Sequence, residues 1–239
     1  MPVDVMMYRE HFAFQFDEES VTTAGLPEVT PFNLDMIDAE WTSNDGEGVY
    51  VAVLDTGLLP QWPFFFSQAN IRDDLGIGFR VDIWWEPGIG FVRGPVYASD
   101  FITKVPEGSG HGTHVTSTVV GFNVNNLYWV RGVAPEAQII PVLVLDAWNV
   151  SYPGGYMQFT GGFYDQIAYG IYYVADLAET LDGPVIISMS LGGPAPSPII
   201  EDAINYAISK GVMVVASAGN EGYAGMGWPG AYPQVISCG

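Results

Sequence analysis

The sequence is poor in basic residues and in cysteine. Its 239 residues include 27 Asp and Glu but only 7 Lys and Arg, which gives a net charge of −20 at pH 7. Because Lys and Arg neutralise the phosphates of nucleic acids and anionic lipids, their scarcity argues against both kinds of partner. The single cysteine, Cys238, has no partner for an internal disulfide, and its place after an apolar run predicts a buried thiol.

Long apolar runs are also missing. No apolar stretch is long enough to cross a bilayer, and the first twenty residues lack the basic start and apolar core of a secretory leader. With 49% hydrophobic residues the chain can bury a substantial core, so we expect one globular domain. Residues 1–30 are predicted to be an N-terminal extension of a domain that covers residues 31–239.

Five short apolar runs predict strands that are buried on both faces, as in a parallel sheet. The first, VYVAVL, ends abruptly at Asp55. The five runs occupy residues 49–54, 139–145, 185–190, 212–218 and 235–238. Strands of this kind separated by helices indicate an α/β fold, with a parallel sheet flanked by helices.

Two segments carry apolar residues at helical spacing, residues 167–181 and 200–208. The second is predicted to end at Lys210-Gly211, where glycine supplies a left-handed cap and lysine suits the helix dipole. Two other stretches, 58–108 and 146–162, interrupt the alternation and are rich in aromatics and glycine. We interpret them as long loops with a functional or partner-binding role.

Asp55-Thr56-Gly57 directly follows the first predicted strand. Gly57 allows a sharp turn, so the carboxylate of Asp55 is expected at the carboxyl end of the sheet, where open α/β sheets place their sites. The carboxylate could orient a histidine, bind a metal or cap the following turn.

Glycines flank His111 on both sides at the start of a predicted helix. They leave room for another chain to approach, and a neutral imidazole near a helix start can act as a general base. His114, one turn later, is predicted to pack or hydrogen-bond in the interior. In a competing reading, Asp55, His111 and His114 together bind zinc.

Two further strand ends carry polar groups between glycines. The run ASAGNEG delivers Asn220, whose side-chain amide can donate a hydrogen bond to a developing oxyanion. The run SMSLGGP offers free backbone groups to an extended peptide.

Four motifs in this order, Asp-Thr-Gly, His-Gly-Thr-His-Val, Ser-Leu-Gly-Gly and Ala-Gly-Asn-Glu-Gly, resemble the subtilisin-like serine proteases, the subtilases. The resemblance runs from about Pro31 to Gly239. It includes GVAP at 132–135 and Trp228-Pro229-Gly230, and it predicts a cis peptide bond before Pro229.

The resemblance implies a secreted endopeptidase that hydrolyses peptide bonds by acyl transfer and requires no cofactor for its chemistry. Asp55 would orient His111, His111 would take a proton from a serine, and Asn220 would stabilise the oxyanion. It also implies a peptide-binding set that pairs with the substrate backbone and walls the specificity pocket, with Gly227 leaving that pocket roomy. This set is Ser190, Leu191, Gly192, Ala218, Gly219 and Gly227.

One element of the family pattern is not in the chain. The family carries its nucleophile in a Gly-Thr-Ser motif that opens a late helix, and no Gly-Thr-Ser occurs in this sequence. We therefore expect the fold to be incomplete at the C-terminus, with the catalytic serine on a missing segment or a second chain. The alternative is an inactive peptide-binding or assembly subunit, for which the aromatics of the 58–108 stretch would provide a partner surface: Trp62, Phe64, Phe65, Phe66, Trp84 and Trp85.

Metal binding enters as a secondary expectation. The resemblance implies structural calcium, and residues 123–127 lie where one calcium-binding loop of the family is expected. However, Phe64 occupies the position at which that site has a carboxylate ligand. A second hard-cation site, or simply a solvated acidic face, is expected from four carboxylates of the long insertion. They are Asp73, Asp74, Asp82 and Glu86.

Overall fold

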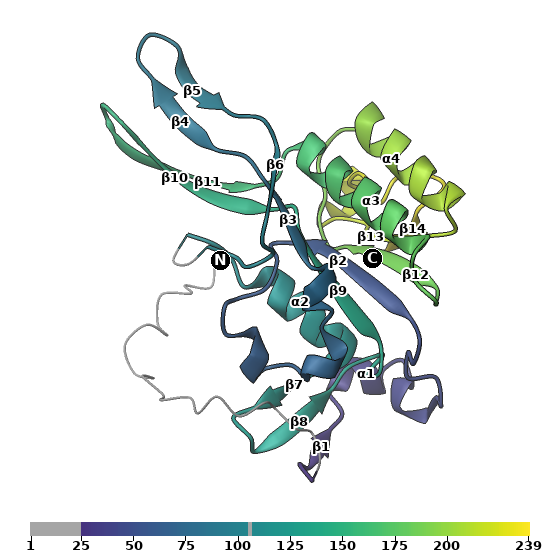
Figure 1. Ribbon diagram of the computed structural model, residues 1–239. Coiled ribbons are helices and arrows are strands. Elements are labelled where there is room, and N and C mark those ends of the chain that lie inside the picture. The colour runs from purple at the N-terminus through teal and green to yellow at the C-terminus, as the bar shows by residue number, and fades with distance from the viewer. Residues whose placement is uncertain (1–24, 105–106) are drawn as a thin grey trace.

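The computed structural model describes residues 25–104 and 107–239 (Figure 1). Most of the predicted extension, residues 1–24, lies outside the described residues. A seven-stranded sheet forms the centre, in the order β14-β13-β12-β2-β9-β3-β6, and every neighbouring pair is parallel except β3 with β6. Its strands are β2 (Tyr50–Asp55), β3 (Ile77–Arg80), β6 (Tyr97–Ser99), β9 (Gln138–Leu143), β12 (Val185–Met189), β13 (Met213–Ser217) and β14 (Ile236–Cys238).

The five predicted strands are β2, β9, β12, β13 and β14, each within two residues of its expected bounds. Side chains alternate across β2, so the strand is buried on both faces. Ala52 and Leu54 belong to a core shared with α3 (Tyr164–Ala178) and α4 (Pro198–Ser209), which lie side by side in Figure 1. Val51 and Val53 pack in a second core against α2 (His111–Val120). The α/β prediction is therefore confirmed.

The helix ends follow from local chemistry. Gln166 is fully buried in the first turn of α3, where its Oε1 accepts the Phe163 N–H and its Nε2 donates to the Phe79 carbonyl. Gly211 follows α4 with φ +83°, in the left-handed region where glycine avoids strain, and Lys210 pairs with Glu179. The predicted end of this helix is confirmed.

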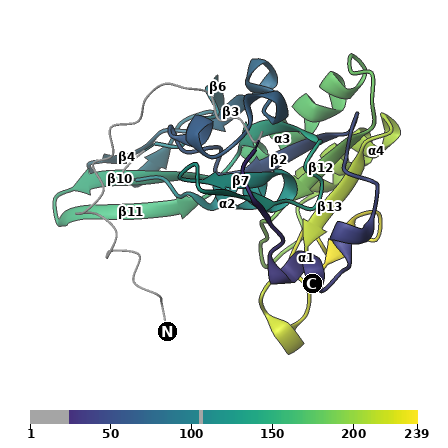
Figure 2. The same ribbon diagram turned by 90° about the horizontal axis from the view of Figure 1, so that it is seen from below.

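The prediction of two long loops is wrong, because both stretches form hairpins. One hairpin joins β4 (Ile83–Glu86) to β5 (Gly90–Arg93), and the other joins β10 (Asp146–Tyr152) to β11 (Gly155–Gly161). Together they project from the sheet as one arm, seen from two sides in Figure 1 and Figure 2. Aromatic rings from both hairpins pack against one another, since Trp85 and Phe91 each contact Tyr152 with ring centroids 5.7 Å apart. This packing gives the arm its own small core.

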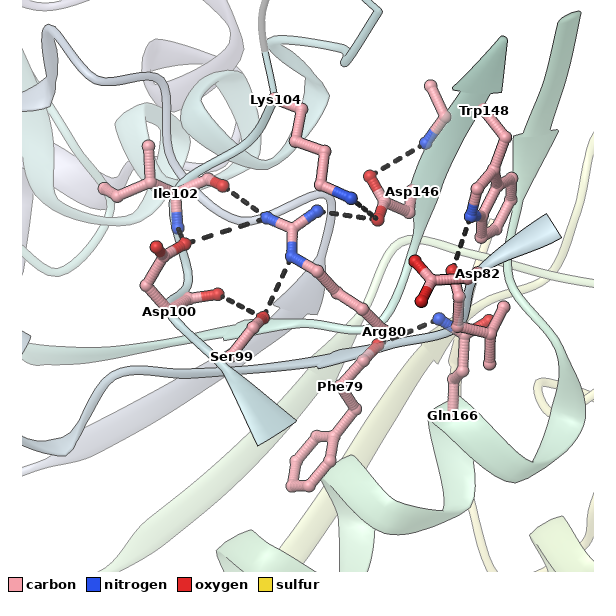
Figure 3. A network of polar contacts seen from close by, with 12 residues as sticks. Phe79, Arg80, Asp82, Ser99, Asp100, Ile102, Lys104, Asp146, Trp148 and Gln166 are labelled. Carbon is pink, nitrogen blue, oxygen red and sulfur yellow. Dashed lines mark hydrogen bonds and ion pairs between the residues drawn. The ribbon is translucent and has the colours of Figure 1, made fainter. Parts of the chain in front are cut away.

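A buried ion pair fastens the arm to the sheet (Figure 3). Arg80, at the end of β3, donates from Nη1 to Asp146 Oδ2 at 2.6 Å and from Nε to Ser99 Oγ at 2.9 Å. Both charged side chains are almost completely buried, and Lys104 Nζ lies 3.8 Å from the same carboxylate. Asp146 is the first residue of β10, so the pair fixes where this hairpin begins.

The surface corrects two further predictions. Cys238 is exposed, because β14 is an edge strand that pairs only with β13 among the described strands. Trp62 and Phe66 are buried in the core against α2, and Phe65 packs on that core. These rings therefore provide no partner surface, which weakens the alternative of an assembly subunit, although Trp84 of the same predicted set is 43% exposed.

Smaller elements complete the described chain, and no helix within residues 25–104 and 107–239 is long and apolar enough to cross a membrane. Three short strands form a separate sheet, β1 (Glu28–Val29), β7 (Gly121–Val124) and β8 (Tyr128–Arg131). The other helical elements are α1 (Phe32–Asp35) and the 3-10 turns η2 (Ala39–Trp41), η3 (Trp62–Phe64), η4 (Gln68–Asn70), η5 (Asp73–Leu75) and η6 (Gly222–Ala224).

Candidate active site

Asp55 and His111 form a hydrogen-bonded pair at the carboxyl end of the sheet. Asp55 is the last residue of β2, and His111 is the first residue of α2. The imidazole Nδ1 lies 2.8 Å from Asp55 Oδ1 and 2.9 Å from Oδ2. The carboxylate is fully buried, whereas 47% of the histidine side chain is exposed. The pair therefore has a buried partner and an accessible one.

Glycine and threonine allow this close approach of α2 to β2. A Cβ on Gly112 would lie 2.3 Å from the Gly57 carbonyl oxygen and 3.2 Å from the Asp55 Cβ, so only glycine fits without a shift. The Gly112 N–H donates to Thr56 Oγ1, and that hydroxyl donates to the Ser109 carbonyl. The glycines were predicted to leave room for another chain, but the space at position 112 is filled by the protein's own backbone at Gly57.

The contacts of Asp55 assign the protons on His111. An ionised carboxylate only accepts hydrogen bonds, so Nδ1 carries the proton that Asp55 accepts, and in the neutral form of the imidazole the lone pair is then on Nε2. Asp55 Oδ1 also accepts the Thr56 N–H at 2.7 Å, which fixes the orientation of the carboxylate. An exposed, neutral Nε2 is the group that a general base needs.

His111 lies on the wall of a cavity of about 730 Å³. Residues 190–195, which follow β12, line one side, and Thr160, Gly161 and Gly162 at the end of β11 also contribute. Ile167 of α3 and Ile200 of α4 add apolar surface. The structure thus brings Ser190, Leu191 and Gly192 into the same cavity as His111.

The other predicted residues do not line this cavity. Gly227 donates its N–H to the Ala218 carbonyl at 2.8 Å, while the neighbouring Trp228 exchanges two backbone hydrogen bonds with Gly193. Ala218, Gly219 and Gly227 therefore lie beside Gly193, in the segment after β12 that lines the cavity. Asn220 is exposed beyond the end of β13, and its N–H donates to Glu221 Oε2 at 2.7 Å. The predicted cis bond at Trp228-Pro229 is confirmed.

His114 does not pack inside, so that prediction is wrong. The buried face of α2 consists of Gly112, Thr113, Thr116 and Val120, and His114 falls on the opposite side, where it is exposed. In the part of the chain that the structure describes, no three His, Cys, Asp or Glu side chains gather as a metal site. The zinc reading of Asp55, His111 and His114 is therefore not supported.

The loop that was expected to bind calcium closes on itself. Asn123 Oδ1 accepts the Asn126 N–H, and Asn123 Nδ2 donates to Asn126 Oδ1 and to the Phe64 carbonyl. Calcium takes six to eight oxygen ligands. The side-chain oxygens of both asparagines accept hydrogen bonds within the loop, and calcium binding there stays a prediction.

The four carboxylates of the long insertion are separated. Asp74 is held by a bidentate contact from Arg72, and this hydrogen bonding lowers the pKa of the carboxyl. Asp82 accepts the Tyr97 hydroxyl, and Glu86 lies on β4. They therefore form no joint cation site among the described residues.

Sequence reasoning missed several residues that shape the site. Thr56 was treated only as part of a turn, although it bridges β2 to α2. Asp146 lines the cavity while its charge is paired with Arg80. The sequence signal that would have indicated Asp146 is a single acidic residue directly after an apolar run. The same signal indicated Asp55.

The sequence was compared with protein families and with known proteins, and these comparisons identify its family. A model of the subtilase family matches residues 46–239. The chain is 31% identical over 241 residues to an alkaline protease of Alkalihalobacillus alcalophilus, a match that covers all of this chain and 52% of the relative. It is 35% identical over 216 residues to an intracellular serine protease of Paenibacillus polymyxa, covering 87% of this chain and 55% of the relative.

Solved structures agree with this assignment of the fold. The chain resembles Sphericase with a TM-score of 0.58 and 33% identity, over 82% of this chain and 55% of that structure. It also resembles the S41 psychrophilic protease with a TM-score of 0.53 and 30% identity, over 81% of this chain and 53% of that structure. The chain thus spans about half the length of the relatives it matches.

Proposed function

The chain belongs to the subtilase family, and from this we propose that it supplies the aspartate and histidine of a serine endopeptidase. The single observation that carries the proposal is the pair formed by buried Asp55 and accessible His111 at the wall of a cavity. An aspartate that holds Nδ1 leaves Nε2 free to accept a proton at the site where a substrate can enter.

The proposed chemistry is acyl transfer. Nε2 of His111 takes the proton of a serine hydroxyl as the oxygen attacks the peptide carbonyl, and it returns that proton to the leaving amine. Asp55 keeps the imidazole in the correct tautomer and stabilises the imidazolium ion that forms. Asn220 is our candidate for the side chain that donates a hydrogen bond to the oxyanion.

The serine is proposed to come from a segment outside this sequence. Three serines line the cavity, and two of them have other contacts. Ser109 Oγ accepts the His111 N–H, and Ser197 is held through its backbone by the Tyr232 hydroxyl. Within residues 25–104 and 107–239 no serine hydroxyl bonds to the ring of His111. A Gly-Thr-Ser segment or a second chain would complete the triad.

The proposed substrate is a protein or peptide bound in extended form. Ser190, Leu191 and Gly192 lie in the cavity and would pair with its backbone, while the neighbouring Ala218, Gly219 and Gly227 would surround the side chain next to the cleaved bond. Export from the cell belongs to the same proposal. The names of the relatives do not decide this point, since one of them is called intracellular.

The experiment that tests the proposal is labelling of native protein with a fluorophosphonate probe, followed by intact-mass analysis of every chain under denaturing conditions. The proposal expects one label per active site, on a serine outside this sequence. If no chain is labelled while an active subtilase is labelled in the same buffer, the proposal fails.

A further inference from the structure

We propose that the outer face of the β10–β11 hairpin is a binding surface for an extended polypeptide segment, which continues the cavity at His111 outward. The inference rests on the proposed function, because it assigns to this face the part of the substrate that lies outside the cavity.

The outer face is continuous with the cavity. Ala147 and Thr160 are cross-strand partners, and both line the cavity that contains His111. Because side chains alternate along a strand, the next pairs on the same face lie two and four residues further out. These pairs are Asn149 with Gln158 and Ser151 with Tyr156.

The opposite face of the same hairpin is already covered. Trp148, Val150 and Phe159 belong to the small core of the arm, and Phe159 packs against Phe91 of the other hairpin at a centroid distance of 5.0 Å. The outer face is therefore the more open of the two, although Met157 at the far end of the covered face is 40% exposed. On the outer face Tyr156 is 75% exposed, and Asn149, Ser151, Gln158 and Thr160 are exposed as well.

The side chains of the outer face are themselves uncharged, although the chain carries a net charge of −20 and the Asn149 amide donates to the neighbouring Glu107 carboxylate at 3.4 Å. Its side chains are hydroxyls, amides and one phenol, which both donate and accept hydrogen bonds. Such groups suit the peptide groups of an extended chain. In its two-stranded sheet β11 pairs only with β10, so the other edge of β11 also offers backbone groups to an added strand.

The arm is held in place before a ligand arrives. Asp146 is fixed by Arg80, and the indole of Trp148 donates to the Val81 carbonyl at 2.7 Å. On the other hairpin, Arg93 pairs with Asp165 at the start of α3. A surface that is already ordered loses little conformational entropy on binding.

The geometry sets the length of the ligand. A strand rises about 3.3 Å per residue, so the seven residues of β11 span roughly 23 Å. About seven ligand residues would cover that span, and those opposite Thr160 and Gly161 would lie at the cavity itself. A ligand bound through its backbone to an uncharged face should show little dependence on salt.

The test uses fluorescence anisotropy with three uncharged peptides. One has four residues, and the other two extend it by six Ser, Ala or Gln residues at the N-terminal or at the C-terminal side. We expect one of the long peptides to bind about tenfold more tightly than the short one, at low and at high salt. The double variant Tyr156→Ala/Gln158→Ala should reduce this advantage to below twofold.

Tyr128→Ala is the matched control, because it removes an exposed tyrosine from the β7–β8 hairpin, and it should keep the tenfold advantage. The inference is overturned if neither long peptide binds more tightly, or if the double variant keeps the advantage. Probe labelling of the same samples separates the two proposals. Label without a length advantage refutes the surface alone, whereas a length advantage without label refutes the protease.

Discussion

Gly112 is the residue that sets the distance between helix α2 and the end of strand β2. A methyl group at this position would meet the Gly57 carbonyl oxygen at 2.3 Å, which no real Cβ tolerates, and the backbone of the turn cannot move aside like a flexible side chain. The helix would have to shift, and His111 would move with it away from Asp55.

We therefore predict that Gly112→Ala lowers the free energy of unfolding by about 1–3 kcal/mol, the usual cost of overpacking. Urea denaturation measures this loss. Gly110→Ala is the control, because its Cβ would have the Leu59 Cδ1 as its nearest neighbour at 3.4 Å, so its cost should stay below about 1 kcal/mol. Equal losses in the two variants would contradict the account.

The positions of individual site residues were predictable where a short sequence motif determines the local backbone geometry. Asp55 and His111 carry such motifs, and the structure places them in contact. His114 and Cys238 were misjudged because their burial depends on neighbours distant in sequence. His114 is exposed because it lies on the face of α2 that points away from the core. Cys238 is exposed because β14 lies at the edge of the sheet.

At the scale of elements, the junction between β3 and β10 depends on a buried ion pair. Removing one partner of such a pair leaves the other charge buried, which typically costs 3–5 kcal/mol. We predict a loss of about this size in the free energy of unfolding for Arg80→Met, measured by urea denaturation. Asp146 would keep the hydrogen bond from the Ala147 N–H, with Lys104 at 3.8 Å as its remaining basic neighbour.

Replacing both partners separates this charge effect from lost packing. The double variant Arg80→Met/Asp146→Leu should recover most of the stability, because no unpaired charge remains. Arg131→Met, which breaks the exposed pair with Glu28, should cost less than about 1 kcal/mol. A double variant as unstable as Arg80→Met would show that the pair does not act through its charges.

The second hairpin of the arm carries a pH-dependent contact. Arg93 hydrogen-bonds to Asp165, and this contact holds the pKa of the Asp165 carboxyl below its usual value. A lowered pKa in the folded state stabilises the protein at pH values above the unfolded pKa of about 3.9. This contribution is lost as the pH falls through the folded-state pKa.

We predict that Asp165→Asn lowers Tm by no more than about 3 °C at pH 6, because both side chains are about one-third exposed and such pairs contribute less than about 1 kcal/mol. The difference from the unchanged protein should shrink as the pH falls below about 4 and through the folded-state pKa of Asp165. Thermal unfolding followed by circular dichroism measures it. A difference that is constant from pH 2 to pH 6 would refute this role.

The strands of the central sheet were predictable because each is a continuous apolar run that is buried on both faces. The hairpins of the arm were not, because their strands mix glycine, aromatic and polar residues and only one face is covered. The cover comes from the other hairpin, through contacts such as Trp85 with Tyr152, and no local pattern reveals that pairing.

The whole molecule has a strongly negative surface. Every Lys and Arg in the described ranges lies within 4.0 Å of a carboxylate, so the remaining acidic groups determine the surface potential. These cations are Arg72, Arg80, Arg93, Lys104, Arg131 and Lys210. Such a field attracts basic polypeptides over distance and is weakened by salt, in contrast to the short-range contacts expected at the uncharged outer face of the arm.

The class of the molecule could be predicted from its sequence because four short motifs in a fixed order specify a family. Their arrangement also identified the pair at the centre of the site. The shape of the cavity was not predictable, since its walls combine the end of β11, the start of α3 and the segment after β12. These parts meet only in the folded chain.

The central claim is that the Asp55–His111 pair activates a serine, and the rate of fluorophosphonate labelling in histidine variants of the complete protein tests it most directly. We predict that His111→Ala slows labelling at least about 10³-fold, because the serine loses its general base. His114→Ala, on the exposed side of the same helix, should label at the unchanged rate. Labelling of His111→Ala at the rate of the unchanged protein would contradict the account.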